Sequence, residues 1–362
     1  MPITKQQIES ALGQVIDQYM DTDLIAAKTV KDIAIDGSKV SVTIELGYPA
    51  AGYFDSLKQT VQDQLSSIEG IGDIDIKVSS KIKSHTVQQN LKPLDGIKNI
   101  IAVASGKGGV GKSTTAVNLA LALQAEGATV GILDADIYGP SIPRMLGCHG
   151  QPDSTDGKSL EPMIGHGIQS MSIGYLVEED TPMIWRGPMV TQALEQLIND
   201  TRWKDIDYMI VDLPPGTGDI QLTLSQKIPV SGAVIVTTPQ DIALLDAVKG
   251  LKMFEKVEVP VLGIVENMST HICSQCGHSE AIFGEGGGLR MAEQQGVDFL
   301  GTLPLDIRIR EQADSGNPTV AAMADSEISA IYREIARKTA AKLATRARDH
   351  SAAFPSIVIE NN

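Results

Sequence analysis

The sequence has few cysteines and no long hydrophobic run. Its three cysteines, Cys148, Cys273 and Cys276, are too few and too unevenly spaced for the disulfide framework of a secreted protein. No stretch approaches the apolar length that a membrane-spanning helix needs, and the residues from Met1 to Gln6 lack the apolar core of a signal peptide. These absences predict a cytoplasmic protein that has no membrane partner.

Positive charge is also scarce. The 362 residues carry 30 Lys and Arg against 45 Asp and Glu, so the formal net charge is −15. A nucleic-acid-binding face needs clustered Lys and Arg to neutralise phosphates, and the composition therefore predicts no nucleic-acid partner, while leaving room for a local basic patch. A hydrophobic content of 42% is ample for the core of one or two domains.

A glycine-rich loop lies between a buried-strand pattern at 100–104 and a helical pattern at 115–125. Glycines permit positive φ and let backbone N–H groups converge on a phosphate at a helix N-terminus. Lys112 can then reach the β- and γ-phosphates, and the Ser113 hydroxyl can bind Mg²⁺. A tight turn without nucleotide is the alternative. We predict an ATP site formed by Gly106, Lys107, Gly108, Gly109, Val110, Gly111, Lys112, Ser113 and Thr114.

The loop contains a second lysine, Lys107, directly after its first glycine. Its ammonium could address phosphate oxygens of the same site or of a facing subunit, or it could be a solvated loop lysine. The form GKGGVGKST resembles the deviant phosphate loop of the MinD/ParA/NifH class of ATPases. That resemblance implies a nucleotide-sandwich homodimer that Lys107 crosses, and catalytic roles for Lys107 and Lys112.

Residues 1–80 show the patterns of a small α/β domain. A capping-box signature at Thr4 and apolar residues from Ile8 to Tyr19 predict an opening helix. Alternating strands flank a turn at Asp36-Gly37, and a second helix and a third strand follow. This segment resembles the small domain of iron–sulfur assembly factors. The polar residues 81–96 are typical of a linker.

From residue 97 to residue 350, short apolar runs alternate with helical patterns. This alternation predicts an α/β fold with a mostly parallel P-loop sheet and helices on both of its faces. Ligands of such sheets gather at the carboxyl ends of the strands. We expect the last long helix, at about 326–348, to pack against the sheet, and residues 351–362 to form a tail.

Two carboxylates follow strand patterns of this sheet. Asp212 ends an apolar run in the Walker-B arrangement, in which the carboxylate binds Mg²⁺. Asp136 follows the run at 130–133, and its segment resembles the switch I region of the same ATPase class, where the equivalent residue positions water. A capping role for Asp134 or Asp136 at the helix near Pro140 is the alternative.

Asn267 follows the strand pattern at 261–265 and can pair with a donor and an acceptor on adenine. It matches the base-contacting Asn of the class, and an Asx turn is the alternative. Arg186 lies in another segment that resembles the class and could contact a neighbouring subunit.

Cys273 and Cys276 have C-x-x-C spacing, so their thiolates can ligate one metal centre. A zinc ion or a four-iron cluster needs four ligands. Either His271 and His278 complete a zinc site, or two chains each contribute a cysteine pair. A redox dithiol is a further alternative, although the pair does not open a helix. The glycine run at 284–288 suggests a hinge beside the cysteines, and Cys148 fits a small buried hydrophobe.

Together these motifs resemble those of the bacterial Mrp/ApbC family of iron–sulfur cluster carrier proteins. The resemblance implies an ATP hydrolase that forms a homodimer and holds a 4Fe–4S cluster between Cys273 and Cys276 of two chains. It also implies partners in the form of a cluster assembly scaffold and apo iron–sulfur proteins. The alternatives are a MinD/ParA-type positioning ATPase and a NifH-like electron-transfer ATPase.

Overall fold

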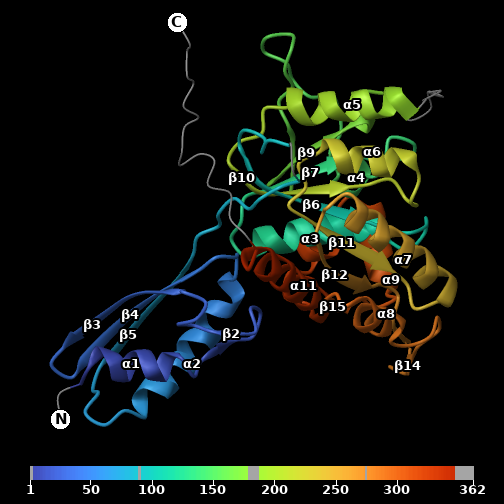
Figure 1. Cartoon of the computed structure of the whole chain (residues 1–362). Helices are drawn as coiled ribbons and strands as arrows, with labels where there is room; N and C mark the ends of the chain where they lie inside the picture. Colours follow the sequence, from blue (N-terminus) through green and yellow to red (C-terminus); the bar gives the residue numbers. More distant parts are fainter. Residues whose placement is uncertain (1–2, 89–90, 178–186, 274, 347–362) are drawn as a thin grey trace, which may run out of the picture.

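The computed structural model describes residues 3–88, 91–177, 187–273 and 275–346 (Figure 1). Two sheets organise these residues, one of three strands near the N-terminus and one of eight strands in the rest of the chain. We refer to the elements around them as the N-terminal unit and the C-terminal unit. Among the described helices, none combines the length and the apolar character needed to cross a bilayer.

The N-terminal unit is built on a small mixed sheet. β3 and β4 pair antiparallel, and β4 and β5 pair parallel. The elements are α1 (Lys5–Leu12), β1 (Ile16–Asp17), β2 (Thr22–Asp23), β3 (Val30–Asp36), β4 (Lys39–Leu46), the 3₁₀ turn η1 (Ala51–Tyr53), α2 (Phe54–Ser66) and β5 (Ile74–Ser80).

Local signals determine most of these boundaries. Thr4 and Gln7 form the expected capping box at the start of α1. Gly37, at φ +60°, closes the hairpin between β3 and β4. The expectation of a helix that continues to Tyr19 is wrong, because α1 ends at Leu12. Beyond it, the Asp17 carboxylate accepts the backbone N–H of Tyr19 and holds this segment in a turn.

The C-terminal unit alternates strands and helices. Its elements are β6 (Ile97–Ala104), α3 (Lys112–Ala125), β7 (Val130–Asp134), α4 (Ile142–Met145), β8 (Met163–Gly165), β9 (Ile168–Ser172), η2 (Ile173–Tyr175), α5 (Gly187–Asp200), β10 (Ile206–Asp212), α6 (Asp219–Lys227), β11 (Gly232–Thr237), α7 (Asp241–Lys256), β12 (Val261–Glu266), β13 (His271–Ile272), β14 (Ser279–Glu280), α8 (Gly287–Gln295), β15 (Phe299–Thr302), α9 (Ile307–Asp314), α10 (Thr319–Ala322) and α11 (Glu327–Ala344).

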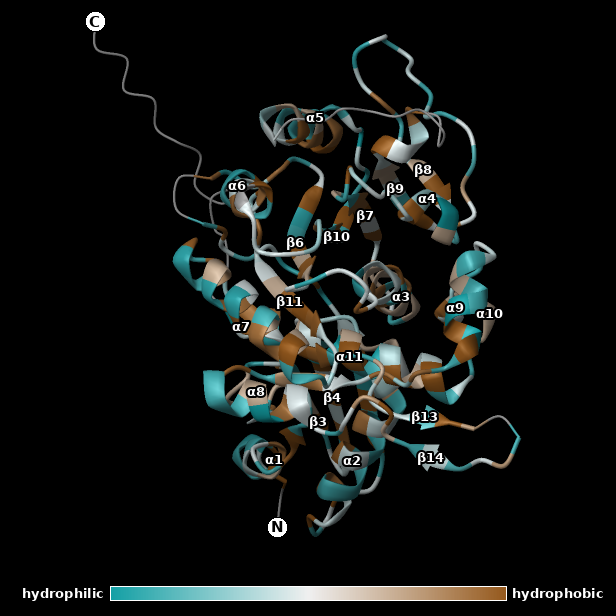
Figure 2. Cartoon of the chain, turned by 90° about the vertical axis from the view of Figure 1, so that its right-hand side faces the viewer, coloured by the Kyte–Doolittle hydropathy of each residue, from teal (hydrophilic) through white to brown (hydrophobic). Residues whose placement is uncertain are grey.

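The central sheet has the strand order β15-β12-β11-β6-β10-β7-β9-β8. Every pairing in it is parallel except that of β8 with β9. Helices α6, α7 and α8 lie along one face, and α3 and α11 lie along the other (Figure 2). The strands are buried because both faces are covered, and the predicted α/β fold with a mostly parallel sheet is confirmed.

The two units are joined by a buried carboxylate at the end of α3. Glu126 follows α3, and its carboxylate accepts the backbone N–H of Gly52 and pairs with Arg337 of α11, each at 2.8 Å. The Glu126 carbonyl also accepts the N–H of Ala51 at 3.2 Å. The Arg337 guanidinium lies over the ring of Tyr19, 5.2 Å from its centroid. Glu126 therefore ties the P-loop helix to the N-terminal unit.

The segment between the units is bound to the C-terminal unit by several hydrogen bonds. The backbone N–H of His85 and its ring Nδ1 lie 3.1 and 2.9 Å from Oδ1 of Asn99 in β6. The Gln88 amide donates to the carbonyl of Ser225 at 2.7 Å. Polar composition alone indicated a linker, but these hydrogen bonds attach it to the sheet.

We predict that Glu126→Ala lowers the free energy of unfolding by about 2–4 kcal/mol, because it leaves Arg337 and the Gly52 N–H without their buried partner. Urea unfolding followed by circular dichroism measures this loss. The control is Lys338→Ala on the same helix as Arg337, which breaks only an exposed pair with Glu334 and should cost at most about 0.5 kcal/mol. Equal losses in the two variants would contradict the assigned role of Glu126.

Candidate nucleotide and cysteine site

Three neighbouring strands of the sheet bring the phosphate loop and two carboxylates together. β10 lies between β6 and β7, and its last residue, Asp212, is in register with Asp134 of β7 and Val103 of β6. Because the strands are parallel, their carboxyl ends meet at one edge of the sheet. The loop that follows β6 therefore faces both carboxylates.

Lys112 lies at the centre of this group. Its ammonium is 2.6 Å from Oδ1 of Asp212 and 3.9 Å from Oδ2 of Asp136, and it donates to the Ser113 hydroxyl at 3.2 Å. The Lys112 side chain is only 6% exposed, and that of Asp212 is fully buried. Burying such charges is costly unless they are paired, so Lys112 and Asp212 depend on each other.

Asp134 organises the loop after β7. Its carboxylate accepts the backbone N–H groups of Ser141 at 2.9 Å and Ile142 at 3.1 Å, and the Ser172 hydroxyl at 3.1 Å. Burial, together with the charge of Asp212, raises the pKa of Asp134 to about 7. Asp134 thus has the capping role considered from the sequence, whereas Asp136 faces Lys112.

Two glycines of the loop are required by close contacts. A Cβ on Gly106 would lie 2.1 Å from the backbone of Asp246 in α7, and one on Gly111 would lie 2.2 Å from Nδ2 of Asn267. Gly111 also has φ +82° as the N-cap of α3. Gly109 shares this φ, but its Cβ would meet no atom within 4 Å. The loop is therefore closely packed against its neighbours at Gly106 and Gly111, and has no close neighbour at Gly109.

Asn267 joins the end of β12 to the loop. Its amide nitrogen donates to the carbonyl of Val110 at 2.8 Å, and its amide oxygen accepts the N–H of Met268 at 2.9 Å. The second contact is made with the next residue and is not the i to i+2 contact of an Asx turn, whereas the first spans 157 positions of the chain. Contact with adenine stays a prediction.

The residues expected to hold Mg²⁺ fit such an ion. The second carboxylate oxygen of Asp212 is buried and has no hydrogen-bond partner among the described residues. The Ser113 hydroxyl lies beside Lys112, the partner of the other Asp212 oxygen. Mg²⁺ usually takes one or two protein oxygens and completes its shell with water and phosphate oxygens, so Ser113 and Asp212 suffice.

Cys273 and Cys276 lie on a hairpin formed by β13 and β14, which projects from the edge of the molecule (Figure 2). The Cys273 N–H donates to the carbonyl of His278, and the Gly277 N–H donates to the carbonyl of Cys273, both at 2.9 Å. Backbone N–H groups of Gln275 and Cys276 hold the pKa of the Cys273 thiol below its usual value. The hairpin therefore favours a thiolate at Cys273.

The expected zinc alternative is not supported within one chain. Among the described residues, no group of three or more His, Cys, Asp or Glu side chains could hold a metal ion. Nδ1 of His271 lies 3.0 Å from the carbonyl of Leu305. Cys273 and Cys276 are both free thiols, and Cys276 is exposed. Two thiols are fewer than the four ligands that a zinc ion or a four-iron cluster takes.

The glycine run after the hairpin provides close packing, and the expectation of a hinge is wrong for Gly287 and Gly288. A Cβ on Gly287 would lie 2.7 Å from the carbonyl oxygen of Pro239, and one on Gly288 would lie 2.9 Å from Cβ of Glu266. The Gly288 N–H donates to the buried Glu266 carboxylate. Glu266, which the sequence analysis overlooked, thus anchors the start of α8 to the end of β12.

Family descriptions match both units of the chain. Residues 96–340 match the NUBPL iron-transfer P-loop NTPase family, and residues 5–78 match a family described as iron–sulfur cluster assembly protein. The chain belongs to the NUBPL iron-transfer P-loop NTPase family. The glycine loop lies between the end of β6 and the start of α3.

Curated relatives of the family cover most of the chain. The iron–sulfur cluster carrier protein of Haemophilus influenzae is 53% identical over 94% of this chain and 92% of its own length. That of Escherichia coli K12 is 55% identical over 89% of this chain and 87% of its own. The mouse iron–sulfur cluster transfer protein NUBPL is 52% identical over 70% of this chain and 80% of its own.

Solved structures share the fold of the C-terminal unit. A nucleotide-binding protein from Archaeoglobus fulgidus in complex with ADP is 38% identical, with a TM-score of 0.54 over 61% of this chain and 88% of its own. The cell division ATPase MinD of Pyrococcus furiosus is 22% identical, with a TM-score of 0.50 over 66% of this chain and 97% of its own. The MinD likeness concerns the fold alone.

The remaining residues singled out from the sequence lie as follows. Lys107 is half-buried, and no described carboxylate lies within 4 Å of its ammonium. Cys148 is buried as expected, and burial raises the pKa of its thiol. Arg186 and the tail at 351–362 lie outside the described residues.

We predict that Gly106→Ala abolishes ADP binding by this NTPase, because the added Cβ collides with the backbone of Asp246 and forces the loop to move. Isothermal titration calorimetry measures the binding. Gly109→Ala is the matched control, since its added Cβ meets no other atom. Its ADP affinity should fall only about tenfold, because the positive φ costs an alanine about 1–2 kcal/mol. Comparable affinities for the two variants would contradict the close packing of the loop at Gly106.

Proposed function

We propose that the chain is an ATP-dependent iron–sulfur cluster carrier that works as a homodimer in the cytoplasm. One observation carries the proposal. The Asn267 amide binds the phosphate loop through Val110, and the hairpin that bears Cys273 and Cys276 begins only four residues after it. A nucleotide at the loop would therefore act on a segment directly connected to the thiols.

The homodimer follows from the incomplete thiol site. Each chain offers two free thiols on a projecting hairpin, and a four-iron cluster takes four cysteine ligands. Two copies of Cys273 and Cys276 related by a two-fold axis supply that number. The cargo would then be a 4Fe–4S cluster held between the chains, accepted from an assembly scaffold and delivered to apo-proteins.

Exposed apolar side chains beside the nucleotide site support a partner on this face. Tyr138, in the loop held by Asp134, is 57% exposed, and Ile242 and Leu245 of α7 are 69% and 65% exposed. The backbone of α7 touches the loop at Gly106. Large exposed apolar side chains on elements that border the nucleotide site suit a surface that a partner covers.

In this proposal the polar residues act on ATP as follows. Lys112 leaves its carboxylates for the β- and γ-phosphates, and Lys107 reaches the phosphates of the facing chain. Asp136 orients the attacking water. Ser113 and Asp212 would hold Mg²⁺, which neutralises phosphate charge when it is bound.

Hydrolysis would change the contacts that position the hairpin. The Gly216 N–H of the loop after β10 donates to the carbonyl of Ser105 at 3.0 Å, so this loop and the phosphate loop move together. Loss of the γ-phosphate would loosen both loops, and Asn267 would transmit the change towards Cys273. The bound nucleotide would in this way decide whether the dimer holds its cluster or releases it.

Anaerobic reconstitution with iron and sulfide tests the cargo. We expect about four irons and four sulfides per two chains, and their loss in Cys273→Ser/Cys276→Ser. Cys148→Ser is the matched control, because this thiol is buried and the variant should keep full occupancy. Metal analysis and Mössbauer spectroscopy provide the readout. Zinc without sulfide, or unchanged iron in the double variant, would refute the carrier function.

Lys107→Ala tests whether Lys107 contacts the nucleotide of the facing chain in a nucleotide-sandwich dimer. We expect the variant to lose ATP-dependent dimerisation and roughly 100-fold or more in ATP turnover, since it removes one charged donor from the phosphates. Analytical ultracentrifugation and phosphate release measure the two effects. Lys39→Ala, an exposed lysine at the start of β4, controls for a general loss of charge. Unchanged dimerisation and turnover in Lys107→Ala would rule out its role across the interface.

A further inference from the structure

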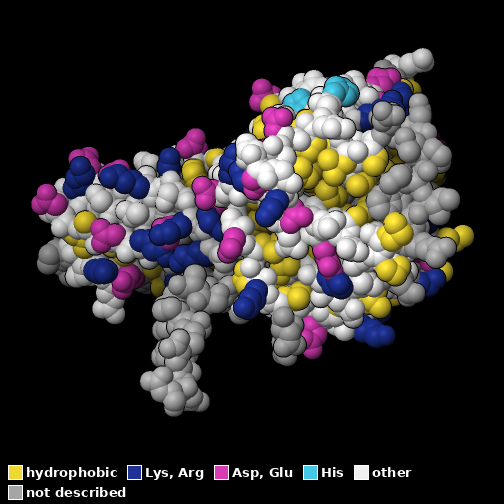
Figure 3. Space-filling model, turned by 90° about the horizontal axis from the view of Figure 1, so that it is seen from above, with side chains coloured by type: hydrophobic (Ala, Val, Ile, Leu, Met, Phe, Trp, Pro, Cys, Tyr) yellow, Lys and Arg dark blue, Asp and Glu magenta, His cyan; other side chains and the backbone are white. Residues whose placement is uncertain are grey.

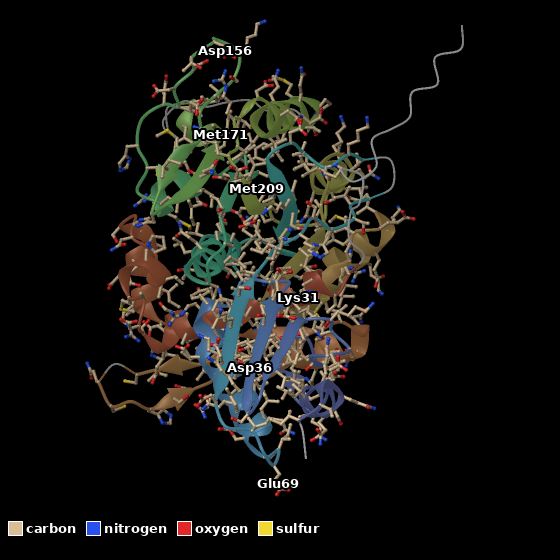
Figure 4. All side chains as sticks on the ribbon, turned by 90° about the vertical axis from the view of Figure 1, so that its left-hand side faces the viewer. Lys31, Asp36, Glu69, Asp156, Met171 and Met209 are labelled. Carbon is tan, nitrogen blue, oxygen red and sulfur yellow. The ribbon has the colours of Figure 1, made fainter. Side chains whose placement is uncertain are left out.

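A cavity of about 610 Å³ lies where the N-terminal unit, the linker and the end of α11 meet. Its volume is within the range of roughly 300–1,000 Å³ that is usual for small-molecule sites. Lys31 lies at the end of β3 nearer the C-terminal unit, whereas Asp36 lies at the far end (Figure 4). Four separate segments form the wall, with residues from 20–31, 45–47, 81–85 and 344–346.

The wall of this cavity is strongly basic in a chain whose net charge is −15. Lys and Arg side chains gather in Figure 3 where the N-terminal unit meets the rest of the molecule. Glu45 is the one carboxylate among the lining residues, and it lies 3.9 Å from Lys31. The basic lining residues are Lys28, Lys31, Lys81, Lys83 and Arg346.

Most of these cations lack an acidic partner. Within the described chain, no carboxylate lies within 4 Å of the charged groups of Lys28, Lys81 or Arg346. Like charges that converge on one cavity repel one another, and an anion between them removes this repulsion. Lys28, Lys81 and Arg346 are exposed, so their charged groups are accessible to a negatively charged ligand in the cavity.

The backbone that carries the cations is held in place. The Asp23 carboxylate accepts the N–H groups of Ile25 and Ala26 at 3.0 and 2.8 Å, which fixes the turn before Lys28. On the linker side, the Lys81 N–H donates to the carbonyl of Leu46 at 2.8 Å. The cations thus lie on ordered segments, which lowers the entropic cost of binding a ligand.

We propose that this cavity binds a small multivalent anion that carries several phosphate or carboxylate groups. Four of the five cations are lysines, which act as point charges and come from two segments, and Arg346 adds a third segment. Dispersed point charges suit a ligand with several charged groups better than a single carboxylate, for which the planar fork of an arginine is the usual partner. A bound polyanion would bridge the N-terminal unit, the linker and the end of α11, in addition to the contacts that Glu126 and the Lys342–Asp21 pair already make between the units.

Calorimetric titration with pyrophosphate and, separately, with citrate tests the site. The full-length protein is first saturated with ADP, because the phosphate loop itself attracts phosphates. We expect saturable binding that weakens at least about tenfold in Lys28→Glu/Lys81→Glu, which reverses two of the cations. Binding of pyrophosphate alone identifies a phosphate ligand, binding of citrate alone identifies a carboxylate ligand, and binding of both identifies a general polyanion site.

The matched control is Lys39→Glu/Lys77→Glu, which makes the same change in net charge on the N-terminal unit but outside the cavity. It should change the affinity by less than about twofold. A second readout is tryptic cleavage within residues 81–96, which pyrophosphate or citrate should slow in the wild type and in the control only. Arg346→Gln repeats the test at the α11 wall. Absence of binding in the wild type, or equal losses in the two double variants, would overturn the proposal.

Discussion

The buried pair of Lys112 and Asp212 is the interaction on which the rest of the site depends. One ammonium faces Asp212 at 2.6 Å and Asp136 at 3.9 Å, while Asp134 lies beside them in the same buried cluster. Carboxylates in such a place need compensation, and backbone N–H groups at Asp134 supply part of it. This group can form only where β6, β10 and β7 are parallel neighbours. The order of these strands therefore determines which charged side chains meet at the site.

Helix α3 extends this constraint to the N-terminal unit. It begins at Lys112 and ends beside Glu126, and its 14 residues span about 21 Å. The helix is buried on nearly all sides, so its two ends move as one body. The nucleotide loop and the anchor at Glu126 therefore belong to a single rigid element. Helix α3 therefore connects the loop at its N-terminus to the N-terminal unit, which Glu126 contacts at its C-terminus.

The cysteine hairpin is also held by buried contacts on both of its sides. Before it, Asn267 is bound to the phosphate loop, and after it, the start of α8 is held by Glu266 through Gly288. Both ends of the segment are thus anchored at the end of β12, while Cys273 and Cys276 lie between them on a projecting turn. Anchored ends and accessible thiols suit a metal centre that a second chain completes.

Local patterns in the sequence determined much of this protein. The phosphate loop, the carboxylates at the strand ends, the alternation of strands and helices and the cysteine spacing are all contained within short windows. Propensity, hydrophobic period and turn chemistry act over such windows, so the parallel sheet and the loop could be predicted from them. The Asp36-Gly37 turn and the capping box at Thr4 are predictable for the same reason.

Contacts between distant residues were decided by the tertiary structure alone. Glu126 meets Arg337 across 211 positions of the chain, Asn267 meets Val110 across 157, and the basic cavity draws on four segments. The turn after α1 also depends on a distant partner, because the buried Asp17 that holds it accepts the hydroxyl of Tyr48. No local pattern encodes these partners. Each depends on which surfaces meet once the sheets have formed, and that is settled by the packing of the whole chain.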